Sequence, residues 1–144
     1  MLILALLAAV PVGLAVALTG RGGGRVPGGG QLAGITLQLA DGADGGTVTA
    51  CGNTHHYRSY PADATIHFLG LISPPGHWSV SLKLKSCYGG TFQSAGTASA
   101  EVSRDGSYHG SFPAPIGGHY YARAEILRAG ALVTRSSKRY FEIR

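Results

Sequence analysis

The segment WSVSLKLK, residues 78 to 85, alternates strictly between apolar and polar side chains. Trp78, Val80, Leu82 and Leu84 would face one way, and the serines and lysines between them would face the other. A period of two is that of a β-strand, and a polar second face is typical of an antiparallel sheet covered on one side only. We therefore expect a half-buried strand here, with its four apolar side chains in the core of an all-β domain.

The same period recurs on both sides of this segment. Alternating apolar residues predict strands at 35–39, 47–51, 64–72, 97–102, 108–112, 120–127, 132–134 and 140–143. Turn-forming residues separate them, notably DGADGG at 41–46, PPG at 74–76 and RDGS at 104–107. The pattern predicts an antiparallel sandwich of seven to nine short strands. Phe112, Tyr120 and Phe141 are expected in its core.

Two cysteines, Cys51 and Cys87, have a spacing that fits neither a CxxC redox motif nor a zinc motif. In an exported chain, one disulfide within the domain is the natural interpretation, and two free buried thiols are the alternative. Cys87 also falls outside the alternation of residues 78–85, so this strand is expected to end or bulge near Ser86.

The first residues form a different kind of segment. LILALLAAVPVGLAVAL, residues 2–18, carries no charge, and we expect one hydrophobic helix over residues 1–19. It could be a cleaved signal peptide, although the basic start is missing. It could also be a short membrane anchor, with Pro11 as a kink, or a helix that packs against identical subunits. Residues 20–34 are rich in glycine and predict a linker to the domain at 35–144.

Composition and motifs argue against several functional classes. The net charge is +5, but the basic residues form separated pairs rather than one face, so a nucleic-acid partner is not expected. The six histidines show no HxH or HExxH spacing, and the Asp41–Asp44 segment indicates a turn rather than a calcium site. Paired carboxylates and a GxSxG motif are absent. We therefore expect no metal, no cofactor and no enzymatic activity.

One polar and aromatic segment is a candidate contact surface. It comprises His55, His56, Tyr57, Arg58 and Tyr60, which we expect to form a compact loop. Loops of this composition often contact partners, here a protein or a glycan. A simple surface crossover is the alternative.

Three segments resemble the last strands of bacterial immunoglobulin-like or fibronectin III-like domains: DGSYHGSF (105–112), GGHYYARAEI (117–126) and KRYFEIR (138–144). The strand that begins at Trp78 is similar to their third strand, where a tryptophan packs the core. The resemblance implies a tyrosine corner, in which the hydroxyl of Tyr120 or Tyr121 bonds back to the chain. The family's disulfide joins the second and sixth strands, so a bond between Cys51 and Cys87 would be a different one.

The order of the parts, a hydrophobic helix followed by an immunoglobulin-like sandwich, is similar to archaeal type IV pilins and related surface filaments. We expect a non-enzymatic, extracytoplasmic structural or interaction protein, held at the cell surface through residues 2–18. The alternative is a pilin-like filament subunit that polymerises through the same residues, and a minor alternative is an accessory subunit of a membrane complex. Basic residues at 134–139 are expected to protect a sheet edge from strand addition.

Overall fold

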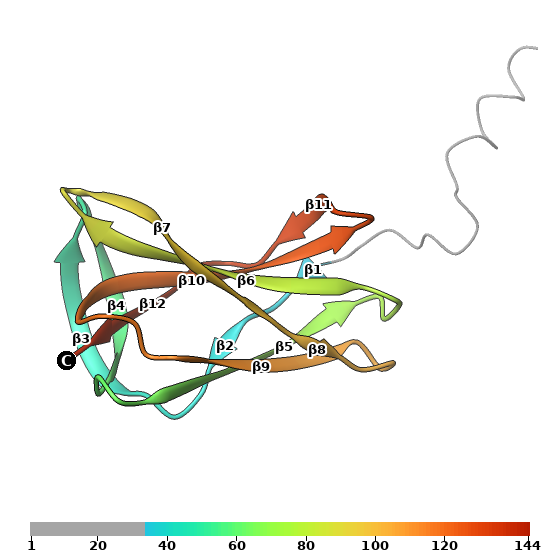
Figure 1. The fold of residues 1–144 in the computed structure, drawn as a ribbon, viewed down its shortest axis with the longest axis horizontal. Coiled ribbons are helices and arrows are strands. Elements are labelled where there is room, and N and C mark those ends of the chain that lie inside the picture. The colour runs from blue at the N-terminus through green and yellow to red at the C-terminus, as the bar shows by residue number, and fades with distance from the viewer. Residues whose placement is uncertain (1–33) are drawn as a thin grey trace, which may run out of the picture. The chain divides into compact units, whose positions relative to one another are not determined.

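The alternating segment after Trp78 forms strand β6 (Ser79–Tyr88) in the computed structural model, which describes residues 34–144 (Figure 1). Val80, Leu82 and Leu84 are buried in the core. Trp78 itself precedes the strand and is only partly buried at the rim of the core. Its Nε1 donates a hydrogen bond to the Pro74 carbonyl oxygen at 3.2 Å. The indole therefore packs back onto the preceding turn, which corrects the expectation that Trp78 fills the core.

Two sheets form the domain. The first has the order β1-β5-β9-β8, with β2 also paired with β5; it contains β1 (Gly34–Ile35), β2 (Gln38–Leu39), β5 (Thr65–Ser73), β8 (Glu101–Val102) and β9 (Ser107–Pro113). The second has the order β3-β4-β12-β10-β6-β7, with β11 also paired with β10. Its other strands are β3 (Ala43–Ala50), β4 (Asn53–Tyr60), β7 (Thr91–Ser99), β10 (Gly118–Arg128), β11 (Ala131–Arg135) and β12 (Arg139–Ile143). The pair of β4 with β12 is parallel.

The all-β, two-sheet prediction is confirmed for the described residues, which contain twelve strand segments instead of seven to nine. Part of the excess is due to β1, β2 and β8, which are two residues long. The predicted helix at 1–19 and nearly all of the linker at 20–34 lie outside the described residues. Within residues 34–144, no helix is long and apolar enough to cross a bilayer.

The main core lies between the two sheets, with Phe141 of β12 at an aromatic centre. The Phe141 ring stacks on Tyr120 at a centroid distance of 5.2 Å and also contacts Phe112 at 5.9 Å and Tyr60 at 6.3 Å. Phe141 is 0% exposed. These four aromatic residues come from β4, β9, β10 and β12, so they join the two sheets.

Tyr120 also makes the backward bond that the resemblance implies for Tyr120 or Tyr121. Its hydroxyl donates a hydrogen bond to the Ile116 carbonyl oxygen, four residues earlier. Tyr121 points to the opposite side of strand β10, because neighbouring residues of a strand face opposite ways.

The turn predicted at 41–46 is shorter than expected, because the chain passes from β2 in the smaller sheet to β3 in the larger one at residues 40–42, where Asp41 has a φ of 62°. Strand β3 already begins at Ala43, and its pairing with β4 shifts register between Asp44 and Gly46. The backbone N–H of Gly46 donates to Asp44 Oδ1 at 2.8 Å, and Gly46 has a φ of 74°. Residues 44–46 therefore form a β-bulge in the hairpin of β3 and β4, which we call the β3–β4 arm. The chain reverses between these two strands at residues 51–52.

Two further boundaries can be compared with the sequence prediction. Strand β6 continues past Ser86 to Tyr88, and the register shift lies between Leu84 and Lys85, opposite an irregular part of β7. The predicted strand at 97–102 is divided at Ala100, so that β7 belongs to the larger sheet and β8 to the smaller one. The bulge expected near Ser86 is thus present just before that residue. The change of sheet at Ala100 was not predicted, because it leaves no mark in the alternation of residues 97–102.

Gly70 marks a close approach between three segments of the smaller sheet. A methyl group at this position would clash with the Thr36 carbonyl oxygen and the Tyr108 ring. Neither group can move easily, because the buried Tyr108 hydroxyl donates a hydrogen bond to that same carbonyl oxygen. We expect Gly70→Ala to lower the free energy of unfolding by about 1–3 kcal/mol in urea denaturation.

Gly117→Ala is the matched control for this prediction. A Cβ at Gly117 would meet its nearest atom at an ordinary contact distance of 3.6 Å. The Gly117→Ala protein should unfold at the wild-type urea midpoint, and equal midpoints for the two variants would contradict the proposed clash.

Candidate functional site

Strand β4 carries all five residues that were predicted to form a contact loop, namely His55, His56, Tyr57, Arg58 and Tyr60. The loop prediction is wrong, because β4 pairs with both β3 and β12. Tyr60 and Tyr57 are buried, on opposite sides of the strand, and Tyr60 belongs to the main core. The remaining three residues, His55, His56 and Arg58, stay accessible at least in part.

These three residues line an open groove of about 570 Å³. The rest of its lining comes from Gln38 and Leu39 of β2 and from Lys138, Arg139 and Tyr140 of β12 and the segment before it. The groove lies where β4 and β12 diverge, because their parallel pairing is confined to Phe141–Arg58, Glu142–Ser59 and Ile143–Tyr60. Side chains of both strands therefore surround an opening at this end of the pair.

The groove has three cationic side chains. Arg58 Nη1 donates to the Gly42 carbonyl oxygen at 3.1 Å, and Arg139 Nε donates to the Leu37 carbonyl oxygen at 2.6 Å. Lys138 Nζ lies 4.6 Å from the centroid of the Tyr121 ring. Among residues 34–144, none of these three cations forms an ion pair with a carboxylate. Each of the three cations therefore contacts a neutral group rather than a carboxylate of the described residues.

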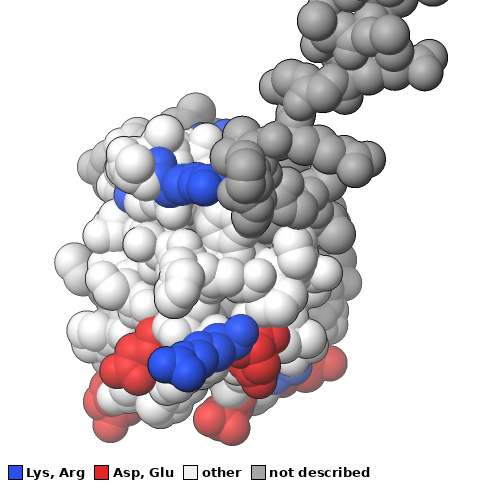
Figure 2. Space-filling view, turned by 90° about the vertical axis from the view of Figure 1, so that its right-hand side faces the viewer, with Lys and Arg blue, Asp and Glu red and all other residues white. Residues whose placement is uncertain are grey.

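Some carboxylates of the described residues have arginine or histidine neighbours outside this set of three. Glu125 pairs with Arg135 at 3.0 Å, and Asp44 lies 3.0 Å from His56, which itself lines the groove. The end of the domain farthest from the β3–β4 arm, on the right in Figure 1, faces the viewer in Figure 2. It is largely uncharged, and its cationic groups are separated, one of them between acidic groups.

A second aromatic cluster covers the outer face of the larger sheet. The His55 ring stacks on Tyr140 at 3.8 Å with an interplanar angle of 10°, and Tyr57 meets Tyr140 at 5.5 Å. The same cluster continues across the sheet to His119, Tyr121 and Phe92. It explains why Tyr57 is fully buried without belonging to the main core, and its His55–Tyr140 pair forms part of the groove wall.

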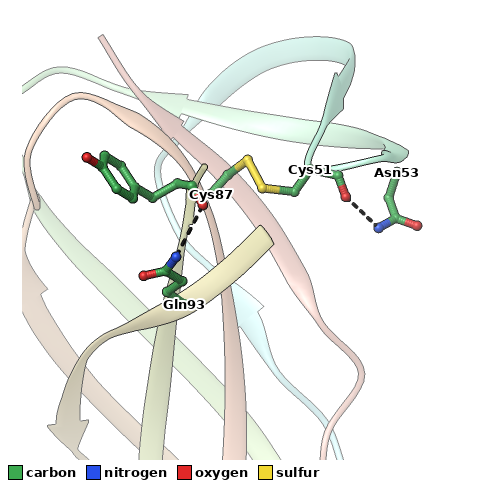
Figure 3. Close-up of a disulfide and its surroundings, with 5 residues drawn as sticks. Cys51, Asn53, Cys87 and Gln93 are labelled. Atoms are coloured by element: carbon green, nitrogen blue, oxygen red, sulfur yellow. Dashed lines mark hydrogen bonds between the residues drawn. A yellow bond between two sulfur atoms is a disulfide. The ribbon is translucent and has the colours of Figure 1, made fainter. Parts of the chain in front are cut away.

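The predicted disulfide between Cys51 and Cys87 is confirmed (Figure 3). Strands β12 and β10 lie between β4 and β6 in the sheet, yet the two Cα atoms are only 5.7 Å apart. The sheet must therefore curl so that the tip of the β3–β4 arm reaches β6. Nearby, Asn53 Nδ2 donates to the Cys51 carbonyl oxygen at 3.1 Å, and Gln93 Nε2 donates to the Tyr88 carbonyl oxygen at 3.4 Å.

The comparison with solved structures finds likenesses in fold. No family model and no curated protein matches the chain. The fold is similar to the PmoD soluble domain of Methylocystis sp. ATCC 49242 (Rockwell). This likeness has a TM-score of 0.43 and 14% sequence identity, and it covers 76% of this chain and 90% of the PmoD domain. We draw no functional conclusion from a likeness of this degree.

The part of the groove that β2 and β12 supply was not predicted from the sequence. Lys138 and Arg139 were interpreted as guards of a sheet edge, but β12 lies inside the sheet between β4 and β10. Arg58 and Arg139 are far apart in the chain, and no local pattern reveals a parallel pairing of their strands. The adjacent Lys-Arg-Tyr at 138–140 was the available signal.

One histidine of the described residues lies beside a buried glutamate. His119 Nε2 lies 3.6 Å from Glu142 Oε2, and Glu142 also pairs with Arg144. Burial raises the pKa of the Tyr57 hydroxyl, with smaller contributions from Tyr140 and Glu142, so this phenol stays protonated at neutral pH. Within residues 34–144, no three His, Cys, Asp or Glu side chains are grouped to hold a metal ion.

Two buried tyrosines should respond oppositely to loss of their hydroxyl groups. Tyr57 Oη has no hydrogen-bond partner, whereas Tyr108 Oη donates to the Thr36 carbonyl oxygen. We expect Tyr57→Phe to raise the free energy of unfolding by about 1 kcal/mol and Tyr108→Phe to lower it by about as much. Urea denaturation at neutral pH measures both changes, and a loss of stability in Tyr57→Phe would contradict the unpaired hydroxyl.

The hydroxyls of Tyr57 and Tyr108 also make the stability of the fold depend on pH. Burial raises the pKa of both hydroxyls above the ordinary tyrosine value in the folded protein. The unfolded chain therefore loses these protons first, so the stability that they contribute is complete below about pH 10 and declines above it. A Tyr57→Phe/Tyr108→Phe protein should show a shallower decline between neutral and strongly alkaline pH.

Proposed function

We propose that this chain is a non-enzymatic protein of the cell surface, an immunoglobulin-like β-sandwich that contacts a partner through the groove between β4 and β12. The observation that carries the proposal is the disulfide between Cys51 and Cys87, because disulfides persist mainly in oxidising, extracytoplasmic compartments. The groove supplies the contact surface, with three cations that are not neutralised by carboxylates of the described chain.

The immunoglobulin-like assignment has two supports. Strand β6 pairs with β10, and β10 pairs with β12, in an order that suits the third, sixth and seventh strands of such a sandwich. The hydrogen bond from Tyr120 to the Ile116 carbonyl oxygen suits a tyrosine corner at the start of the sixth strand. Neither feature identifies a partner, because a fold alone does not determine what a protein binds. The partner is therefore inferred from the residues of the groove.

Attachment through residues 2–18 belongs to the same proposal. An uncharged apolar segment of this length can hold a domain at a bilayer or in a helical assembly. The glycine-rich residues that follow would separate the domain from that attachment.

Surface labelling of intact cells that produce the full chain tests the proposal. A membrane-impermeant amine reagent should label the domain before lysis, and the purified chain should retain the mass of residues 2–18. Labelling only after lysis would contradict surface display. A mature chain that begins after residue 20 would contradict attachment. Fibres that contain the chain, seen by electron microscopy of sheared surface material, would favour the pilin-like alternative.

A further inference from the structure

We propose that the groove between β4 and β12 binds the carboxylate groups of an acidic glycan, an inference that rests on the proposed use of this groove as a contact surface. Three cations, Arg58, Lys138 and Arg139, line the groove without a carboxylate partner among the described residues. The volume of about 570 Å³ is in the range of sites that take small ligands or a short stretch of a polymer.

The two arginines are oriented before any ligand arrives. Each uses one donor for a backbone carbonyl, Arg58 for Gly42 and Arg139 for Leu37, and so keeps its other N–H groups free. A planar guanidinium offers paired donors that match the two oxygens of a carboxylate. Because the anchoring bonds already restrict the side chains, less conformational entropy is lost when a carboxylate binds.

The groove wall suits a sugar better than a peptide. His55 and Tyr140 both line the groove and are only partly buried, so they present accessible aromatic surface beside the cations, against which the C–H groups of a sugar ring would pack. The Gln38 side chain is exposed there and can bond to hydroxyl groups. A peptide that added a strand between β4 and β12 would have to displace the His55–Tyr140 pair, which bridges the two strands at 3.8 Å.

Calorimetric titration of the full chain, purified with its disulfide intact in a neutral detergent, tests the inference. The probe is an oligogalacturonate, and the matched ligand control is the same oligosaccharide with its carboxylates methyl-esterified. We expect saturable binding of the acidic form that weakens as salt is raised, and no binding of the ester. Equal binding of both forms, or no binding of either, would overturn the proposal.

Charge-removing variants locate the site. Arg58→Gln and Arg139→Gln should each weaken oligogalacturonate binding about tenfold or more, because each removes a charge-assisted pair of hydrogen bonds. Arg128→Gln removes the same charge from an exposed position at the end of β10 and should bind as the wild type does. Lys138→Gln serves as a further groove variant if the loss of the Arg139–Leu37 bond prevents folding. Equal affinity in all folded variants would overturn the assignment.

Two outcomes distinguish failure of the glycan inference from failure of the proposed surface function. Polyglutamate that binds as tightly as the oligogalacturonate would overturn the glycan and favour an acidic peptide in the same groove. A chain that is labelled on intact cells but binds no oligogalacturonate would overturn the glycan inference and leave the proposed surface function in place.

Discussion

Phe141→Ala is expected to lower the free energy of unfolding by about 3–5 kcal/mol. Phe141 is fully buried, and its ring contacts Tyr60, Phe112 and Tyr120. Truncation would leave a cavity among rings that the backbones of four strands hold in place, so little collapse can fill it. Urea denaturation followed by near-ultraviolet circular dichroism measures both the stability and the packing of the tyrosines.

Two other truncations calibrate this expectation. Ile116 is 88% exposed, so Ile116→Ala should leave the urea midpoint unchanged. Trp78→Ala should cost less than Phe141→Ala, because the indole is only partly buried at the rim. A larger loss for Trp78→Ala than for Phe141→Ala would contradict the arrangement of the core.

Removal of the disulfide is expected to lower the free energy of unfolding by about 4 kcal/mol, the chain-entropy value for cysteines 36 residues apart. The double variant Cys51→Ala/Cys87→Ala avoids a lone reactive thiol and leaves the residues around the bond intact. The effect should be strongest at the β3–β4 arm, since the bond attaches the tip of that arm to β6. Hydrogen exchange of the amides in β3 and β4 measures this local loosening.

Reduction of the wild-type protein provides the control. Dithiothreitol should lower wild-type stability to about that of the double variant and should leave the double variant itself unchanged. A double variant as stable as the oxidised wild type would show that the curled sheet holds its shape without the bond.

Strands β5 and β6 were predictable from sequence because each has one buried and one accessible face. Ile66 and Phe68 in β5 and Val80 and Leu82 in β6 are buried at every second position, with more accessible residues between them. Their period of two therefore reports directly on the two faces of a sheet.

Strand β4 was not predictable for the opposite reason. Tyr57 and Tyr60 are three residues apart, so they face opposite sides of the strand, and both are buried. Tyr60 belongs to the main core and Tyr57 to the outer aromatic cluster, while the residues between them are polar. A strand that contacts two separate clusters has no single buried face, and its sequence resembles that of a surface loop.

The groove was only half predictable for a related reason. Its β4 side lies within the segment at 55–60, whose polar and aromatic composition predicted a contact surface. Its β12 side depends on a parallel pairing of strands that are far apart in the chain. When the neighbouring strands are unknown, basic residues on a strand indicate a protected sheet edge. Here β12 lies between β4 and β10, and the basic residues at its start line the groove beside β4.

The interior position of β12 has a consequence for biogenesis. Ribosomes deliver the chain from its amino end, so β4 and β10 emerge before the strand that must lie between them. We expect the nascent polypeptide to stay in an open, translocation-competent form until residues 139–143 arrive, because these residues bring Phe141 to the aromatic centre. With the surface location proposed above, such late closure would keep the chain unfolded while it passes through an export channel.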